Sequence, residues 1–391
     1  MLHHLTVFAL LAGSPVALAQ AIHPIAQIPA LAAQAKGVQP GRELSLPSAP
    51  ERAAPLEQLW ASGTREPAVA ELERILERIP KASPDEAEHA GARQILATWL
   101  EQIGRIRSAS EQIERLAEQN LLPAGEATRA QRGRLLFRLE RFDEALEQLP
   151  SQDAASLAMR CDAAAALGRF EESNRELAAL SERLGPESLE VARRDGLRLL
   201  RADDPKEALH CFDLALLQDS TDPGALFGRG RALIALGDRE AGLVVLTEHR
   251  RILPLRDALD FAYQSLALAP LHGPNHAKLA DAQAALDRID AATASYDRAL
   301  ELAALDDLIP IALRAARHAE ERRRHPAEAV RVLDQAFERL PDVRFLVRAG
   351  DIALRAGDAK LARLRYGRAL EQRPNDAQIR ARLEAAEAEQ P

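Results

Sequence analysis

The sequence has only two cysteines, Cys161 and Cys211, in 391 residues. They cannot form the framework of several disulfides that small secreted domains use, and they lack the paired spacing of zinc-binding motifs. Each falls at a small or apolar position of an expected helix, which favours buried thiols in the core. Their pairing stays open on the sequence alone, because an exported chain could oxidise them.

Aromatic residues are scarce as well, at 4% of the chain, and β-branched residues are few beside Ala, Leu, Arg and Glu. Such a composition of helix formers predicts an all-α protein whose close contacts are made by alanine. The formal net charge of −8 argues against a general nucleic-acid binder, which normally has a basic field. No run of about 18 apolar residues follows the N-terminus, so no transmembrane helix is predicted.

Motifs of catalysis are also missing. The sequence has no G-x-x-x-x-G-K-[ST] phosphate loop, no G-x-S-x-G nucleophile elbow and no H-E-x-x-H pair. His272 and His276 lie near Asp281, but a Gly-Pro pair separates the two histidines, so they do not share one helical turn as metal ligands would. The sequence therefore predicts a protein that is not an enzyme and that holds no cofactor and no metal.

The first residues have the pattern of a secretory signal. A short apolar stretch at 5–13 precedes an A-x-A site at 17–19, which predicts cleavage before Gln20. We interpret 1–19 as a signal peptide, with an ordinary disordered N-terminus as the alternative because the first basic residue is Lys36. Prolines recur through 20–55, which predicts a Pro/Ala-rich disordered linker. Export would place the protein in the periplasm.

From residue 56 onward the pattern is helical, and it repeats. One spacing of small, large and small residues occurs at Ala208, Phe212 and Ala215, at Ala292, Tyr296 and Ala299, and at Ala362, Tyr366 and Ala369. A small residue precedes each first alanine by twelve positions, as Gly196, Ala280 and Gly350. Two antiparallel helices approach closely only where the facing residues are small, so Gly350 and Ala362 leave room for Tyr366. Gly357 is expected to supply the left-handed cap between them.

This pattern resembles the tetratricopeptide repeat, a helix-turn-helix unit of about 34 residues. The resemblance implies an all-α, right-handed superhelical solenoid of antiparallel helix pairs. We expect a repeat array over 126–376, with about six repeats and one extra helix near 255–270 after a helix end at Pro254. Residues 56–125 are expected to form an N-terminal helical region of degenerate repeats, and 377–391 a C-terminal capping helix and tail.

First-helix residues that point away from the packing within a repeat should line a concave groove. Arginine outnumbers acid among them, which favours an acidic segment or the C-terminus of a partner as the ligand. A solvated, arginine-rich face without a ligand is the alternative. The candidate groove residues are Arg193, Arg201, Phe227, Arg231, Asp281, Arg314, His318, Arg322, Arg344, Asp351 and Arg355.

The repeat resemblance implies a non-catalytic scaffold for protein–protein interaction, placed by the signal peptide in the bacterial envelope. Roles of that family in assembly or secretion, including exopolysaccharide export, are the expectation for the pathway. The alternative is a solenoid that binds an acidic polysaccharide directly, although scarce aromatic residues count against sugar stacking. The Lys and Asn pattern of the family's carboxylate clamp for chaperone tails is not found.

Overall fold

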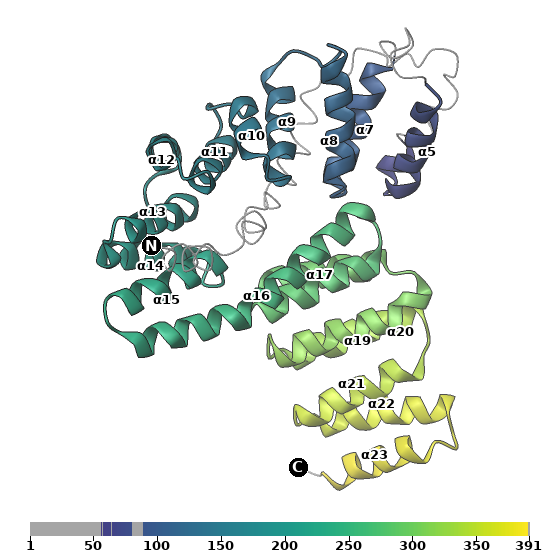
Figure 1. The fold of residues 1–391 in the computed structure, drawn as a ribbon. Coiled ribbons are helices and arrows are strands. Elements are labelled where there is room, and N and C mark those ends of the chain that lie inside the picture. Colours follow the sequence, from purple (N-terminus) through teal and green to yellow (C-terminus); the bar gives the residue numbers. More distant parts are fainter. Residues whose placement is uncertain (1–55, 57, 64, 80–88, 390–391) are drawn as a thin grey trace, which may run out of the picture. The chain divides into compact units, whose positions relative to one another are not determined.

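The computed structural model describes residues 56, 58–63, 65–79 and 89–389. The named elements of secondary structure within these ranges are all α-helices (Figure 1). The prediction of an all-α array of helix pairs is confirmed. The predicted signal peptide and linker at 1–55 lie outside the described residues. The contacts within the chain divide it into two compact units, which we call unit 1 and unit 2. Unit 1 ends at Pro254, and unit 2 begins at Leu255.

Unit 1 is a succession of helices joined by short turns. The pairs α7–α8, α9–α10, α11–α12 and α13–α14 pack together, each helix against the next in the chain. The helices are α5 (Arg65–Glu77), α7 (Ala90–Gln102), α8 (Ile106–Glu118), α9 (Glu126–Arg138), α10 (Phe142–Gln148), α11 (Ala154–Ala166), α12 (Phe170–Leu184), α13 (Leu189–Arg201), α14 (Pro205–Gln218), α15 (Pro223–Ala235) and the first part of α16 (Arg239–Leu268).

Unit 2 is built in the same way, from the pairs α17–α18, α19–α20 and α21–α22 followed by α23 (Figure 1). Its helices are the second part of α16, α17 (Gly273–Ala285), α18 (Ile289–Leu302), α19 (Leu305–Glu321), α20 (Pro326–Arg339), α21 (Val343–Arg355), α22 (Ala359–Gln372) and α23 (Ala377–Ala388). In both units we call the leading member of each pair its first helix and the other its second helix.

Small residues hold the helices of each pair together, as the sequence predicted. At Gly350 a Cβ atom would lie 2.6 Å from Cε1 of Tyr366, and at Gly196 a Cβ would lie 2.7 Å from Cε1 of Phe212. Both rings are buried, as is Ala362 beside Tyr366. A larger residue at either glycine would force the helices apart. This contact is the reason why a small residue recurs at the same distance before each buried ring in the sequence.

The turns follow ordinary capping chemistry. Gly357 has a φ of +82°, the left-handed conformation that ends α21 without strain. Asp358 then accepts a hydrogen bond from the Leu361 N–H at 2.9 Å and caps α22. The same role at other helix starts belongs to Asp153, Asp204, Asp222, Asp342 and Asp376.

The structure differs from the sequence analysis at α16. We predicted a helix end at Pro254 and an extra helix near 255–270, but α16 is one helix that contains Pro254. A proline removes one backbone hydrogen bond, and that loss does not end a helix whose apolar spacing continues on both sides. Ile252 and Leu259 lie two turns apart and are both buried.

The C-terminal helix α23 covers the last repeat. Its inner side buries Ile379 and Ala386 in the cluster that contains Tyr366 and Leu346. The outer residues of α23 are exposed and mostly polar or small, as Gln378, Arg380, Ala381, Glu384 and Glu387. Such a face ends the stacking of repeats, because it offers no apolar surface to a further helix pair.

Candidate binding face on the first helices

Several consecutive first helices pack against one another within each unit. In unit 2, α17 packs against α19 and α19 against α21; in unit 1, α9 packs against α11 and α13 against α15. We call the surface formed by their outward residues in each unit the first-helix face. This is the surface on which the candidate groove residues were placed from the sequence.

Ion pairs between consecutive first helices cross this face in both units. In each, a carboxylate on one helix meets an arginine about one repeat further along the chain. We call the set the ion-pair ladder. Its rungs are Glu101–Arg134 at 3.0 Å, Asp162–Arg194 at 2.7 Å, Asp281–Arg314 at 2.8 Å, Glu320–Arg355 at 2.7 Å and Asp351–Arg382 at 3.2 Å.

Two rungs in unit 2 continue into the repeat core through a tyrosine. The Tyr366 hydroxyl donates a hydrogen bond to Asp351 at 2.8 Å, and the Tyr296 hydroxyl donates one to Asp281. Burial, followed by the neighbouring carboxylate, raises the pKa of both tyrosines. The phenols therefore stay protonated donors, and they fix the carboxylates that the arginines of the next repeat reach.

Five of the seven candidate arginines are bonded to carboxylates of the chain itself. Arg314 and Arg355 are rungs of the ladder. The other three are Arg193 with Asp222 at 3.5 Å and Glu190 at 3.4 Å, Arg322 with Asp287, and Arg344 with Asp342 at 2.8 Å. Arg193 is also buried. A ligand would have to displace these partners, so the five are poorly prepared to receive a carboxylate from outside.

His318, which the sequence placed in the groove, lies in the repeat core. Its side chain bonds Thr293 Oγ1 at 3.0 Å, its ring centroid lies 5.3 Å from that of Tyr296, and the residue is only 5% exposed. Burial lowers the pKa of His318, and the nearby cations Arg322 and Arg323 lower it further. It serves packing rather than a surface contact.

Arg201 and Arg231 differ from the other candidates. Arg201 lies over the ring of Phe170, with 5.0 Å to the centroid, and Arg231 lies 5.9 Å from the centroid of Phe227. Neither has a hydrogen bond or an ion pair to a carboxylate among the described residues. Partial burial lowers the pKa of both guanidinium groups, although the Arg201 residue is still exposed at the surface.

The sequence explains why the ladder has no acid on α13 or α15. Asp162, Asp281 and Asp351 each follow the small contact residue of their first helix, whereas α13 has Leu197 and α15 has Arg231 at that position. With no acid there, α14 also has Phe212 where α18 and α22 have a hydrogen-bonding tyrosine. The buried pair Arg193–Asp222 joins α13 to the N-terminus of α15 instead.

Two further aromatic residues of this region were missed from the sequence. Phe170, at the start of α12, is 47% exposed and lies under Arg201. His249 on α16 has its ring centroid 5.5 Å from that of Phe227. Phe170 could have been found from the sequence. It is a bulky ring in the first turn of a second helix, directly after the turn at Gly168, and the packing within the repeat does not require a ring there.

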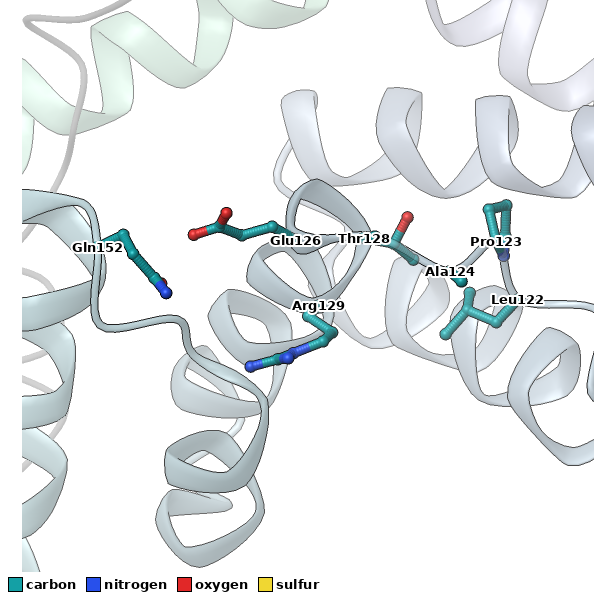
Figure 2. Close-up of a pocket in the computed structure, with 8 residues that line it drawn as sticks. Leu122, Pro123, Ala124, Glu126, Thr128, Arg129 and Gln152 are labelled. Carbon is teal, nitrogen blue, oxygen red and sulfur yellow. The ribbon is translucent and has the colours of Figure 1, made fainter.

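A separate open pocket of about 530 Å³ lies before α9. Figure 2 shows its labelled lining residues, from the 122–125 segment, the first turn of α9 and Gln152. It contains one acid, Glu126, and one base, Arg129, both exposed. This balance of charge selects no class of ligand.

In the part of the chain that the structure describes, three or more His, Cys, Asp or Glu side chains nowhere gather as metal ligands would. Cys161 is buried and Cys211 half-buried, and both are free thiols. No helix within the described ranges is both long and apolar enough to cross a membrane.

No protein-family model and no curated protein matches the chain. Solved structures of repeat proteins resemble it at low identity. A thermophilic TPR protein from Thermus thermophilus is 21% identical, covers 51% of this chain and 98% of its own, with a TM-score of 0.28. A tetratricopeptide repeat protein from Parabacteroides merdae is 16% identical, with 76% and 99% covered and a TM-score of 0.33.

The C-terminal part of a TPR repeat-containing protein from Cytophaga hutchinsonii is 13% identical, with 73% of this chain and 98% of that one covered and a TM-score of 0.32. It is the helix-pair packing of the chain itself, with Gly196 against Phe212 and Gly350 against Tyr366, that gives it a tetratricopeptide-type fold.

Proposed function

We propose that the chain is a non-catalytic scaffold that binds a protein partner on the first-helix face of unit 1. The ligand is an acidic segment or the C-terminus of that partner. Arg201 and Arg231 receive its carboxylates, and the rings of Phe170 and Phe227 pack beside its apolar residues. The observation that carries the proposal is the contrast between these two arginines and the five that are already bonded to acids.

Physical chemistry favours these two positions. A guanidinium group over an aromatic face is held in place and partly desolvated while its N–H donors stay open to a ligand. A charge-assisted hydrogen bond from a carboxylate then restores the interaction that burial removed. At the ladder positions the same bond would only replace an existing one, which leaves little net gain.

Peptide binding tests the proposal directly. Fluorescence anisotropy would compare labelled peptides that are rich in Asp and Glu with peptides of the same apolar content that are rich in Lys. We expect Arg201→Glu/Arg231→Glu to weaken binding of the acidic peptides by about tenfold or more, as lost charge-assisted bonds do. The matched control is Arg314→Glu/Arg355→Glu, which makes the same charge change on unit 2 and should bind as the wild type does.

Two results would contradict the proposal. One is unchanged affinity in the Arg201→Glu/Arg231→Glu chain, shown to be folded by its circular dichroism. The other is a loss of binding in the Arg314→Glu/Arg355→Glu control alone, which would mean that the ladder arginines bind the peptide. Polygalacturonate in the same assay tests the alternative ligand, an acidic polysaccharide. Tight binding of this polymer with no preference among peptides would favour that alternative.

We further propose that the protein acts in the bacterial envelope after export, in assembly or secretion, including exopolysaccharide export. This part rests on the apolar stretch at 5–13 and the A-x-A site at 17–19. Intact-mass measurement on native protein from the producing cell tests it. We expect a chain that begins at Gln20, and a chain that still contains Met1 would refute the signal peptide.

A further inference from the structure

His249 occupies a position that four other helix pairs give to a buried alanine. In those pairs the residue seven places after the small contact residue of the second helix is Ala215, Ala299, Ala336 or Ala369. Each of these alanines is at most 3% exposed. In α16 the small contact residue is Gly242, packed against Ile234, and the seventh residue after it is the half-buried His249. The last helix pair of unit 1 therefore departs from a rule that the other four follow.

The end of unit 1 gives the physical reason for this exception. An alanine at the seventh position lets the first helix of the next pair approach closely. Unit 1 ends at Pro254, within α16. Among the described residues of this unit, no first helix follows α15, so a residue larger than alanine fits at the end of the pair.

The side chain of His249 adjoins the ligand site proposed on unit 1. Its ring centroid lies 5.5 Å from that of Phe227, and the two rings are tilted by 50°. The guanidinium group of Arg231 lies 5.9 Å from the centroid of the same Phe227 ring. A carboxylate bound at Arg231 would therefore lie beside a ring that the imidazole also contacts.

The groups around His249 favour its neutral form in the free chain. Burial, followed by the neighbouring cation Arg250, lowers the pKa of His249. Glu248, the acid next to it on α16, is paired with Arg251 at 2.7 Å. From α15 the charged group at the same aromatic ring is Arg231, which is another cation. A carboxylate added to this cluster would reverse the balance and favour the protonated imidazole.

From this arrangement we propose that His249 is a further residue of the ligand site, and that it makes the binding of an acidic segment depend on pH. The inference rests on the proposed function, because it requires a ligand carboxylate at Arg231. The bound carboxylate stabilises the imidazolium form, so the complex takes up a proton that the free chain does not hold. Affinity for acidic segments therefore rises as the pH falls from 8 toward 5.5.

Linkage between proton and ligand gives the sign of this effect. The carboxylate raises the pKa of His249 in the complex above its pKa in the free chain. Between these two pKa values the complex holds more protons than the free chain, so acid strengthens binding. The Asp and Glu side chains of a ligand keep their charge over the same range, because their ordinary pKa is about 4.

Fluorescence anisotropy with the labelled peptides rich in Asp and Glu measures the effect. For the wild-type chain we expect the dissociation constant to be about three to ten times smaller at pH 5.5 than at pH 8, since a difference of one pKa unit corresponds to a factor of ten. The salt concentration is held at 0.15 M, because screening alone changes such affinities. The Lys-rich peptides should show no gain at pH 5.5.

Two variants separate His249 from the general gain of positive charge in acid. His249→Gln has no titratable ring, so it should bind the acidic peptides with the same affinity at pH 5.5 and at pH 8. His210→Gln is the matched control, because His210 is an exposed histidine on α14 of the same unit, and this variant should keep the full rise. Circular dichroism at both pH values would establish that each variant is folded.

Nuclear magnetic resonance of chains labelled at histidine gives a direct readout. The His249 signal is the one that disappears in His249→Gln. Its titration should shift to higher pH when the acidic peptide is added in excess, whereas the signal of His210 should titrate at the same pH with and without peptide.

The outcomes distinguish this inference from the function on which it rests. Acidic peptides that bind through Arg201 and Arg231, but with one affinity at pH 5.5 and pH 8, would leave the proposed function intact and overturn the role of His249. A rise that persists in folded His249→Gln would overturn it as well. Absence of binding at both pH values would overturn the proposed function and this inference together.

Discussion

The Tyr366 hydroxyl donates a hydrogen bond to Asp351 at 2.8 Å, and Asp351 in turn pairs with Arg382 on the next helix. One phenol thus connects the packing inside a repeat with the ion pair between repeats. Tyr366→Phe removes this link and keeps the ring. We expect a loss of about 1 kcal/mol in the free energy of unfolding, since Asp351 is only half-buried and keeps Arg382. Urea unfolding followed by circular dichroism measures it.

The reverse change at the equivalent position of unit 1 should also destabilise the fold. Phe212 is fully buried between Gly196 and Gly228, and its neighbour α13 has no acid at Leu197. Phe212→Tyr therefore buries a hydroxyl without a carboxylate acceptor, at a cost of about 2 kcal/mol. Equal stability of Phe212→Tyr and the wild type would mean that the tyrosine–aspartate pairs of unit 2 are incidental.

Gly350 provides a test of the packing between helices. Its missing Cβ would lie 2.6 Å from the Tyr366 ring, so Gly350→Leu should lower the free energy of unfolding by roughly 2–4 kcal/mol through overpacking. Gly367→Ala on α22 is the matched control, because no atom lies near its absent Cβ. There we expect a gain of about 0.5–1 kcal/mol from helix propensity. A neutral Gly350→Leu would show that the repeat register is misplaced.

The burial of ion pairs along the ladder predicts unequal costs. The Arg194 side chain is 3% exposed and the Asp162 side chain 11%, whereas the Arg314 and Asp281 side chains are 35% and 45% exposed. Asp162→Ala leaves a buried guanidinium with Glu190 as its remaining acid and should cost about 3 kcal/mol. Asp281→Ala removes an exposed pair and the acceptor of Tyr296, and it should cost about 1 kcal/mol. Thermal unfolding of the two variants compares them.

Acid should weaken unit 2 through His318. Because its folded-state pKa is lowered, the neutral ring is favoured in the folded chain, and this stability is present above the unfolded pKa of about 6.5. It is lost as the pH falls below 6.5 toward the folded pKa, since the unfolded chain then binds the proton more readily. Thr293, Tyr296 and Asp281 surround the ring along with the cations Arg322 and Arg323.

Unfolding by urea at a series of pH values between 5 and 8 tests this pH dependence. His318→Gln, which keeps a polar group for Thr293, should flatten the curve below pH 6.5. His249 in unit 1 also has a lowered pKa, caused by burial and by Arg250, so His249→Gln should remove a separate part of the same slope. An unchanged slope in His318→Gln would assign the acid sensitivity to other groups.

The fold could be predicted from the sequence because its determining contacts are local. Gly350 and Tyr366, or Gly196 and Phe212, meet across one short turn, so their spacing of 16 residues is the same in these copies of the repeat. The continuity of α16 was not predictable, because a proline such as Pro254 ends some helices and is contained in others.

The candidate site could be predicted only in part, because its chemistry depends on partners about one repeat away. Nothing local in the sequence tells Arg314, whose acid is Asp281, from Arg231, which has none among the described residues. His318 was misplaced for a related reason. The turn after α19 is one residue longer than the turn after α17, which shifts the register that the other copies share.

The polar outer face of α23 limits the number of helix pairs that stack in unit 2. Every repeat of unit 2 before it presents an apolar side that the next helix pair covers, and only α23 presents none. Removal of α23 would leave Leu346, Ala353 and their neighbours exposed at the end of the stack, a surface made to receive a first helix. Another copy could then add end to end without closure, and a chain of fixed length would become the seed of a growing filament.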